Sequence, residues 1–281
     1  MYAHVNDADL YYEEAGTGEK YILCMSQIPD PDQKGWPYDL APDGYHVYII
    51  QMRGYGKSTH ISDHFENDWY DIWADDVDAF ARQFGIERYV YTGLSDGAGI
   101  GWHLCLRHPG SLIGFVSLSG GPHSRKIGSI NPFRKNHISQ TAQPDMVLKW
   151  ATYQKQCMLS YAKRYPEGSA LNQEFREKAE KLYADQQHRS IEEFLINPSI
   201  PFPHVHTDEE LLSILSEIRI PMLLINGKKD AILPPSKVLD VSAVIPGVKV
   251  VSYQDGTNRV QYDHRQDVHD EILLFLKKYC P

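Results

Sequence analysis

Short apolar and β-branched runs alternate along the chain with longer segments whose apolar positions recur every three or four residues. The runs Tyr21–Met25 and His46–Ile50 have the length and composition of buried strands. Between residues 69 and 84 the large apolar side chains repeat at helical spacing, and Gly85 follows as a helix-ending residue. This alternation predicts an α/β fold with a doubly wound, mostly parallel sheet and crossover helices.

The alternation is interrupted between residues 121 and 203. In that stretch Gly, Pro and Ser residues lead into helical segments near residues 145–164, 171–187 and 191–195, with no strand pattern among them. Strand patterns resume at Pro221–Ile225 and Val248–Tyr253, before a last helix at about residues 266–278. We therefore predict a core domain formed by residues 1–120 and 204–281, with a helical cap inserted at residues 121–203.

Charge and composition argue against a nucleic-acid-binding protein and against a membrane protein. The 281 residues include 28 Lys and Arg against 37 Asp and Glu, a formal net charge of −9, which disfavours nucleic acid as a partner. No apolar run is long enough for a membrane span, the N-terminus does not resemble a secretion signal, and the four cysteines lack metal-site spacing. We expect a cytoplasmic protein that binds a medium-sized small molecule and no membrane. Its oligomeric state stays open, a homodimer being one alternative.

One turn carries the strongest chemical signal. The segment Gly93-Leu-Ser-Asp-Gly97 follows the predicted strand Tyr89–Thr92 and precedes a predicted helix. Such a G-x-S-x-G turn needs small residues beside the serine because the chain bends sharply there. Ser95 is therefore the candidate nucleophile, and the backbone N–H of Asp96 is placed to donate to an oxyanion at the helix N-terminus.

Several further motifs make the chain similar to the α/β-hydrolase superfamily over most of its length. Arg53-Gly-Tyr-Gly-Lys-Ser58 resembles the family's R-G-x-G-x-S loop, and Ile218–Asp230 resembles the strand and loop that present the acid of its catalytic triad. The resemblance implies a capped serine hydrolase in which Asp230 orients a histidine base for Ser95. The alternative for Asp230 is a loop-capping aspartate. The resemblance implies no cofactor and no metal.

The histidine that this resemblance requires is missing. In the family the histidine lies before the last helix, and the same spacing in this chain leads to Asn258, in Gly256-Thr-Asn-Arg259. An amide cannot accept the serine proton near neutral pH, so acyl transfer should be slower by about 10³-fold or more. Two explanations stay open. One is an engineered His→Asn change that keeps a ligand intact, and the other is a natural departure.

Two other histidines are alternatives for the base. His264 lies six residues after Asn258, where a surface role is favoured. His123 follows the end of a predicted strand, and strand ends face the site in doubly wound sheets. We therefore also count His123 among the candidate substrate-binding residues.

The loop after the first buried strand departs from the family pattern as well. The family commonly has His-Gly there, whereas this chain has Ser26-Gln27-Ile28. We expect the N–H groups of Ile28 and Asp96 to form the oxyanion hole. Ser26 and Gln27 either contact substrate or satisfy loop backbone groups. The Asp96 carboxylate either favours an amine-bearing or hydroxylated substrate or stabilises the helix N-terminus.

The predicted cap has an aromatic stripe that includes Trp150 and Tyr153. Such a stripe either lines a substrate pocket or packs the cap against the core. The sequence as a whole predicts hydrolysis of an ester, lactone or related acyl bond through an acyl-enzyme at Ser95, disabled by Asn258. The alternatives are a ligand-binding or signalling protein without turnover, and a cofactor-independent lyase or oxygenase on the same fold.

Overall fold

A single eight-stranded sheet forms the centre of the protein. The computed structural model describes residues 1–30, 32–65, 68–122, 145–196, 201–202, 204–232 and 235–280. The strand order is β1-β2-β4-β3-β5-β6-β7-β8; β1 and β2 pair antiparallel with their neighbours, and all later pairs are parallel. The predicted doubly wound, mostly parallel sheet is thereby confirmed. The strands are β1 (Tyr2–Val5), β2 (Ala8–Ala15), β3 (Lys20–Ser26), β4 (Tyr45–Gln51), β5 (Tyr89–Leu94), β6 (Leu112–Leu118), β7 (Met222–Gly227) and β8 (Lys249–Tyr253).

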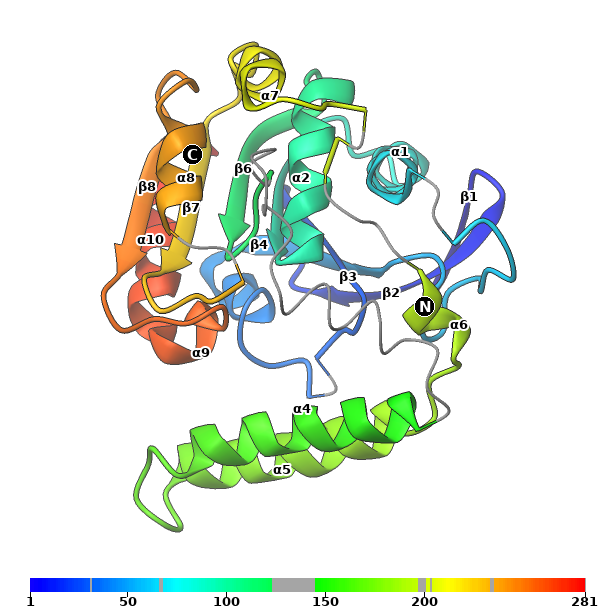
Figure 1. Ribbon diagram of the computed structural model, residues 1–281, viewed down its shortest axis with the longest axis vertical. Helices are drawn as coiled ribbons and strands as arrows, with labels where there is room; N and C mark the ends of the chain where they lie inside the picture. The colour runs from blue at the N-terminus through cyan, green and yellow to red at the C-terminus, as the bar shows by residue number, and fades with distance from the viewer. Residues whose placement is uncertain are drawn as a thin grey trace.

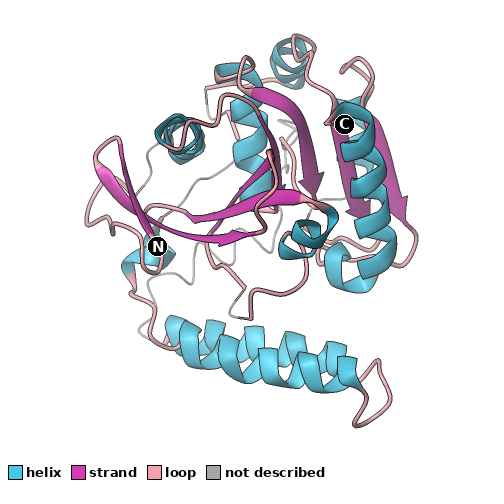
Figure 2. Cartoon of the chain, turned by 180° about the vertical axis from the view of Figure 1, so that it is seen from behind, coloured by secondary structure: helices cyan, strands magenta, loops and turns pink. Residues whose placement is uncertain are grey.

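Helices cover both faces of this sheet (Figures 1 and 2). Successive strand side chains point to opposite faces, so Tyr89 and Tyr91 of β5 join one apolar core and Val90 joins the other. The helices are η1 (Tyr38–Asp43), α1 (Trp69–Gln83), α2 (Asp96–Arg107), α4 (Met146–Ala162), α5 (Ala170–Gln186), α6 (Glu192–Leu195), α7 (Asp208–Leu215), α8 (Pro235–Ser242), α9 (Val260–Asp263) and α10 (Arg265–Tyr279).

Helices α4 and α5 form a hairpin that lies beyond the ends to which β6, β7 and β8 point (Figure 1). The inside of the hairpin is apolar, since Met158 and Tyr161 of α4 are buried with Phe175 of α5. Residues 123–144, 197–200 and 203 lie outside the described residues, so the predicted cap boundaries at 121 and 203 stay a prediction. We refer to α4 and α5 as the cap hairpin.

Within the described residues, no helix is long and apolar enough to cross a membrane. The same part of the chain contains no cluster of three or more His, Cys, Asp or Glu side chains that could hold a metal ion. All four cysteines are free thiols, and burial raises the pKa of Cys24 to about 12.

Candidate active site

Ser95 stands at a strained turn between β5 and α2. Its backbone has φ 53° and ψ −116°, an unusual conformation for a residue with a side chain, and the residue is exposed. A Cβ added to Gly93 would lie 2.3 Å from the Gly97 carbonyl carbon, and one added to Gly97 would lie 2.4 Å from the Met25 oxygen. The two glycines of the motif are therefore required by close backbone packing.

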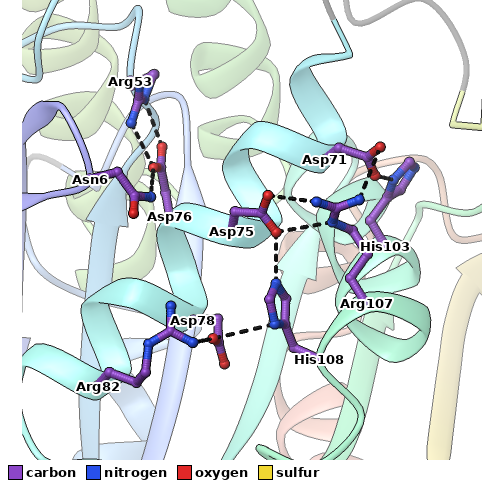
Figure 3. A network of polar contacts seen from close by, with 10 residues as sticks. All are labelled: Asn6, Arg53, Asp71, Asp75, Asp76, Asp78, Arg82, His103, Arg107 and His108. Atoms are coloured by element: carbon purple, nitrogen blue, oxygen red, sulfur yellow. Dashed lines mark hydrogen bonds and ion pairs between the residues drawn. The ribbon is translucent and has the colours of Figure 1, made fainter.

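The helix that begins at this turn is fixed by ionic contacts with α1 (Figure 3). His103 Nδ1 lies 2.6 Å from an Asp71 oxygen, and Arg107 donates two hydrogen bonds to the Asp75 carboxylate, at 3.0 and 2.6 Å. Burial lowers the pKa of His103, although the Asp71 carboxylate opposes this shift. These contacts hold α2, and with it the elbow, against the neighbouring helix.

The loop after β3 lies beside the start of α2. Gln27 donates from Nε2 to Asp96 Oδ2 at 2.9 Å, and the Tyr70 hydroxyl donates to Asp96 Oδ1 at the same distance. Each Asp96 oxygen thus accepts a hydrogen bond from a neutral side chain. The contact between Asp96 and Gln27, in the loop after β3, was not predicted from the sequence.

The Ile28 N–H, predicted to donate to an oxyanion, has a local acceptor here. It donates to Ser26 Oγ at 3.2 Å, and the same hydroxyl donates to the Ile28 carbonyl at 3.0 Å. Ser26 therefore satisfies backbone groups of its own loop, one of the two roles weighed for it. The 3.2 Å contact is at the long end for a hydrogen bond, so this N–H can turn to a stronger acceptor at low cost.

Asp230 lies three residues beyond the end of β7 and is buried, with 4% of its surface exposed. Its Oδ1 accepts the N–H of Ile232 at 2.8 Å, and its own N–H donates to the Gly227 carbonyl at 3.1 Å. The loop-capping contact considered for Asp230 is therefore present. A buried carboxylate can cap its loop and still orient a histidine, because each oxygen has two lone pairs.

The loop that contains Asn258 packs directly on the Asp230 loop. Lys229 donates its backbone N–H to the Gly256 carbonyl at 2.8 Å. A Cβ on Gly227 would approach the Gly256 carbonyl carbon to 2.1 Å, so only glycine fits at this contact. Because β5, β7 and β8 are parallel, the residues after them share one edge of the sheet. Ser95, Asp230 and Asn258 all follow strands at this edge.

Asp263 holds the Asn258 loop in place. Its Oδ2 accepts the backbone N–H of Thr257 at 2.6 Å and the Thr257 hydroxyl at 2.7 Å. Its Oδ1 accepts from the cap hairpin, from Tyr161 at 3.0 Å and Arg164 at 2.7 Å. Burial raises the pKa of Asp263, but these hydrogen bonds outweigh it and leave the pKa below its usual value. One carboxylate therefore joins the loop to the cap hairpin.

Of the two alternative histidine bases, His264 lies in the described part of the chain. His264 stacks on the Tyr253 ring with centroids 4.3 Å apart, and its Nε2 lies 2.9 Å from Asp255. His123 lies outside the described residues. Neither observation tests whether either histidine acts as a base, so both stay predictions.

The aromatic side chains of α4 are partly exposed at one end of the helix and buried at the other. Trp150 and Tyr153 have ring centroids 5.6 Å apart, and Tyr153 is 44% exposed. Further along the helix, Tyr161 is buried against Phe175 and Tyr262. The distal part of the stripe thus packs the cap hairpin onto the core, whereas Trp150 and Tyr153 remain candidates for contact with a ligand.

Comparison with known proteins settles the family. Residues 25–264 match the family described as alpha/beta hydrolase fold. The chain belongs to the α/β-hydrolase family. This hydrolase is 22% identical to the AB hydrolase superfamily protein YisY of Bacillus subtilis, over 95% of this chain and 94% of that protein. It is also 22% identical to 2-hydroxy-6-oxononadienedioate/2-hydroxy-6-oxononatrienedioate hydrolase 2 of Pseudomonas putida, over 96% of this chain and 92% of the relative.

Solved structures agree with this assignment at the level of the fold. The enol-lactonase of Burkholderia xenovorans superposes with a TM-score of 0.70 at 17% identity, and the match covers 99% of this chain and 100% of the lactonase. A hydrolase from Pseudomonas aeruginosa superposes with a TM-score of 0.73 at 19% identity, covering 98% of this chain and 97% of that one.

Sequence reasoning missed two residues of this site. They are Tyr70, whose hydroxyl contacts Asp96, and Asp263, which accepts from Thr257. No sequence signal identifies Tyr70. For Asp263 the spacing is a signal, since it is an acidic residue five positions after Asn258, the predicted place of the base.

Proposed function

We propose that this protein is a serine hydrolase of an ester, lactone or related acyl bond, working through an acyl-enzyme at Ser95. The observation that carries the proposal is the strained elbow, where Ser95 is exposed at φ 53° and ψ −116° between two close-packed glycines. Strain of this kind is retained where the surrounding structure requires it, commonly at a reacting group. The names of the enol-lactonase and of the dienedioate hydrolase are compatible with this class of reaction.

The proposed chemistry assigns one role to each group. Ser95 Oγ attacks the acyl carbon, and the Asp96 and Ile28 N–H groups donate to the oxyanion that forms. Collapse of this intermediate breaks the bond to the alcohol oxygen, which leaves with the proton taken from Ser95, and water then hydrolyses the acyl-serine. In a complete triad, a histidine at position 258 would take the serine proton and Asp230 would orient it. With Asn258 in that place the proton has no strong acceptor, so we propose that turnover is low in this chain.

The test is to restore the base. Asn258→His should raise turnover of p-nitrophenyl esters or γ-lactones by about 10³-fold, the size expected for a positioned general base. Mass spectrometry during turnover should find the acyl group on Ser95, and Asn258→His combined with Ser95→Ala should lose the gain. An unchanged rate in a well-folded Asn258→His protein, with no acylated Ser95, would contradict the proposal.

A second candidate is a ligand-binding protein that keeps the hydrolase frame without turnover, and Asn258 is the observation that favours it. Such a protein would bind its ligand with Asn258 present and would gain no activity from Asn258→His. Under either proposal the ligand is a small molecule and the protein is cytoplasmic. The same kinetic experiment therefore separates the two functions.

A further inference from the structure

Basic side chains near the boundary between the cap hairpin and the core are almost all matched by carboxylates. Lys178 is 1% exposed and its Nζ lies 2.6 Å from Asp30. Arg164 pairs with Asp263, and Arg265 pairs with Glu174 at 2.9 Å. Pairing of this kind is expected, because a cation that loses contact with water needs an opposite charge nearby. Further pairs in this region include Lys181 with Asp32, Arg189 with Glu193, Lys155 with Glu180, and a second partner of Arg265, Asp39.

Arg259 departs from this pattern. Its side chain is half-buried, and its Nη2 donates to the Gln154 amide oxygen of α4 at 2.8 Å. Within the described residues it forms no ion pair with a carboxylate. A guanidinium has five N–H donors, and a neutral amide cannot compensate its charge. Arg259 is thus a positive charge held by a neutral hydrogen-bond partner, with no carboxylate in ion-pair contact among the residues described.

The Arg259 charge lies beside the loop that contains Asn258. Arg259 follows Asn258 directly, and its backbone N–H donates to Thr257 Oγ1 at 3.1 Å within the same loop. Its side chain reaches α4 at Gln154, the residue that follows Tyr153 on that helix. The guanidinium therefore stands between the Asn258 loop and the exposed aromatic end of α4.

The surroundings of Arg259 suit a ligand with an apolar part. Trp150 lies 5.6 Å from Tyr153 and 6.4 Å from Phe194, measured between ring centroids. The Arg189 guanidinium lies over the Phe194 ring at 4.5 Å, but Glu193 compensates its charge, whereas Arg259 has no such ion pair among the residues described. Aromatic rings beside an uncompensated cation recognise an apolar group that ends in a carboxylate. The Asp96 carboxylate lies at the elbow and its two oxygens accept from Gln27 and Tyr70, so it favours placing a ligand carboxylate at the Arg259 end of the site, away from Asp96.

We infer that Arg259 binds a carboxylate of the ligand, so the site selects an acidic ester, lactone or related acyl compound over a neutral one. In a protein of net charge −9, a local cation also opposes the general repulsion of an anionic ligand. This inference rests on the proposed function only for the nature of the scissile bond. Recognition of the carboxylate needs no turnover, and it can be measured separately.

The experiment compares 4-phenylbutyrate with its neutral amide, 4-phenylbutyramide, by titration calorimetry on the full chain. The acid should bind at least about tenfold more tightly than the amide, as expected for a charge-assisted hydrogen bond. Arg259→Gln should weaken the acid by the same factor and leave the amide unchanged. Arg259→Lys keeps the charge but loses the fork of donors, so it should fall between the two.

Lys163 offers a matched control, since it is an exposed cation at the end of α4 with the same charge. Lys163→Gln should leave the preference for the acid intact, and far-UV circular dichroism should show that both variants fold. Equal binding of acid and amide, or binding of neither, overturns the inference. So does an equal loss for both ligands in Arg259→Gln. A failure of Asn258→His to hydrolyse esters would instead count against the proposed reaction.

Discussion

The nucleophile elbow and the Asn258 loop are built on the same packing rule but differ in chemistry. In both, a glycine allows two backbone segments to touch: Gly93 meets Gly97 at the elbow, and Gly227 meets Gly256 beside the loop. The elbow presents the serine that acyl transfer requires. The loop instead presents an amide, Asn258, at the position where the sequence predicts a histidine base.

This difference shows that the frame of a site and its reacting groups are determined separately. Backbone contacts at the two glycine pairs depend on the absence of a Cβ and are indifferent to the side chain at position 258. The carboxylate of Asp263 likewise holds Thr257, not Asn258. A loop of this kind keeps its shape whether or not the base is present, so the fold alone does not report activity.

The substitutions with the largest expected effect on stability test whether the two regions share this packing rule. Gly93→Ala and Gly227→Ala should each lower the free energy of unfolding by about 3 kcal/mol or more, because each new methyl overlaps backbone atoms that cannot move aside. Urea denaturation monitored by fluorescence measures both losses. A loss below about 1 kcal/mol in only one variant would break the parallel between the two regions.

Gly256→Ala is the matched control for this comparison. Its Cβ would meet no atom closer than 3.1 Å, and two of its three nearest neighbours are side-chain atoms, of Tyr253 and His264. Small adjustments can accommodate these contacts, so we expect a loss of no more than about 1 kcal/mol. Similar losses for Gly227→Ala and Gly256→Ala would indicate that general loop strain, not the backbone contact, is responsible.

The contribution of sequence reasoning also differs between parts of the molecule. Strands β3, β4, β5, β7 and β8 were predicted to within two residues, because buried parallel strands form continuous apolar runs. The β1 and β2 hairpin was missed although Ala8, Leu10 and Tyr12 are buried at alternate positions, since the aromatic Tyr11 between them obscures the alternation in the sequence. Helix α7 was missed despite the capping box of Thr207 and Glu210, which is visible in the sequence.

At the site, local motifs were informative and long-range contacts were not. The glycines and Ser95 were identified from a five-residue pattern whose geometry is local. The partners of Asp263 include Tyr161, 102 residues away in sequence, and no spacing rule connects them. The roles of Ser95, Asp230, Asn258 and Ile28 in catalysis stay predictions, because position alone does not measure reactivity.

A smaller loss of stability is expected when the carboxylate that supports the Asn258 loop is removed. Asp263→Asn should cost about 1 to 3 kcal/mol of unfolding free energy, because it removes a buried acceptor from Thr257 and a charge from Arg164. Asp267→Asn removes the same charge at a side chain that is 68% exposed, and it should change stability by less than about 0.5 kcal/mol. Equal effects would show that net charge, not the contact, matters.

The smallest expected effect is the pH dependence of that same contact. Burial raises the pKa of Asp263, but its hydrogen bonds with Thr257, Arg164 and Tyr161 hold it below the value of about 3.9 for a free aspartate. A lowered pKa in the folded state stabilises the protein above the unfolded pKa, and this stabilisation is lost as the pH falls through the folded pKa.

The difference in unfolding free energy between the wild-type chain and Asp263→Asn should therefore be constant from about pH 7 to 5 and decrease below about pH 4. Subtracting the variant cancels the titration of other groups, including His103, whose pKa burial lowers. Urea denaturation at pH 6 and pH 3 measures the change. A difference that stayed constant down to pH 3 would mean that the carboxylate acts through shape and not through its charge, and Asp263 would then resemble the glycine contacts at the elbow.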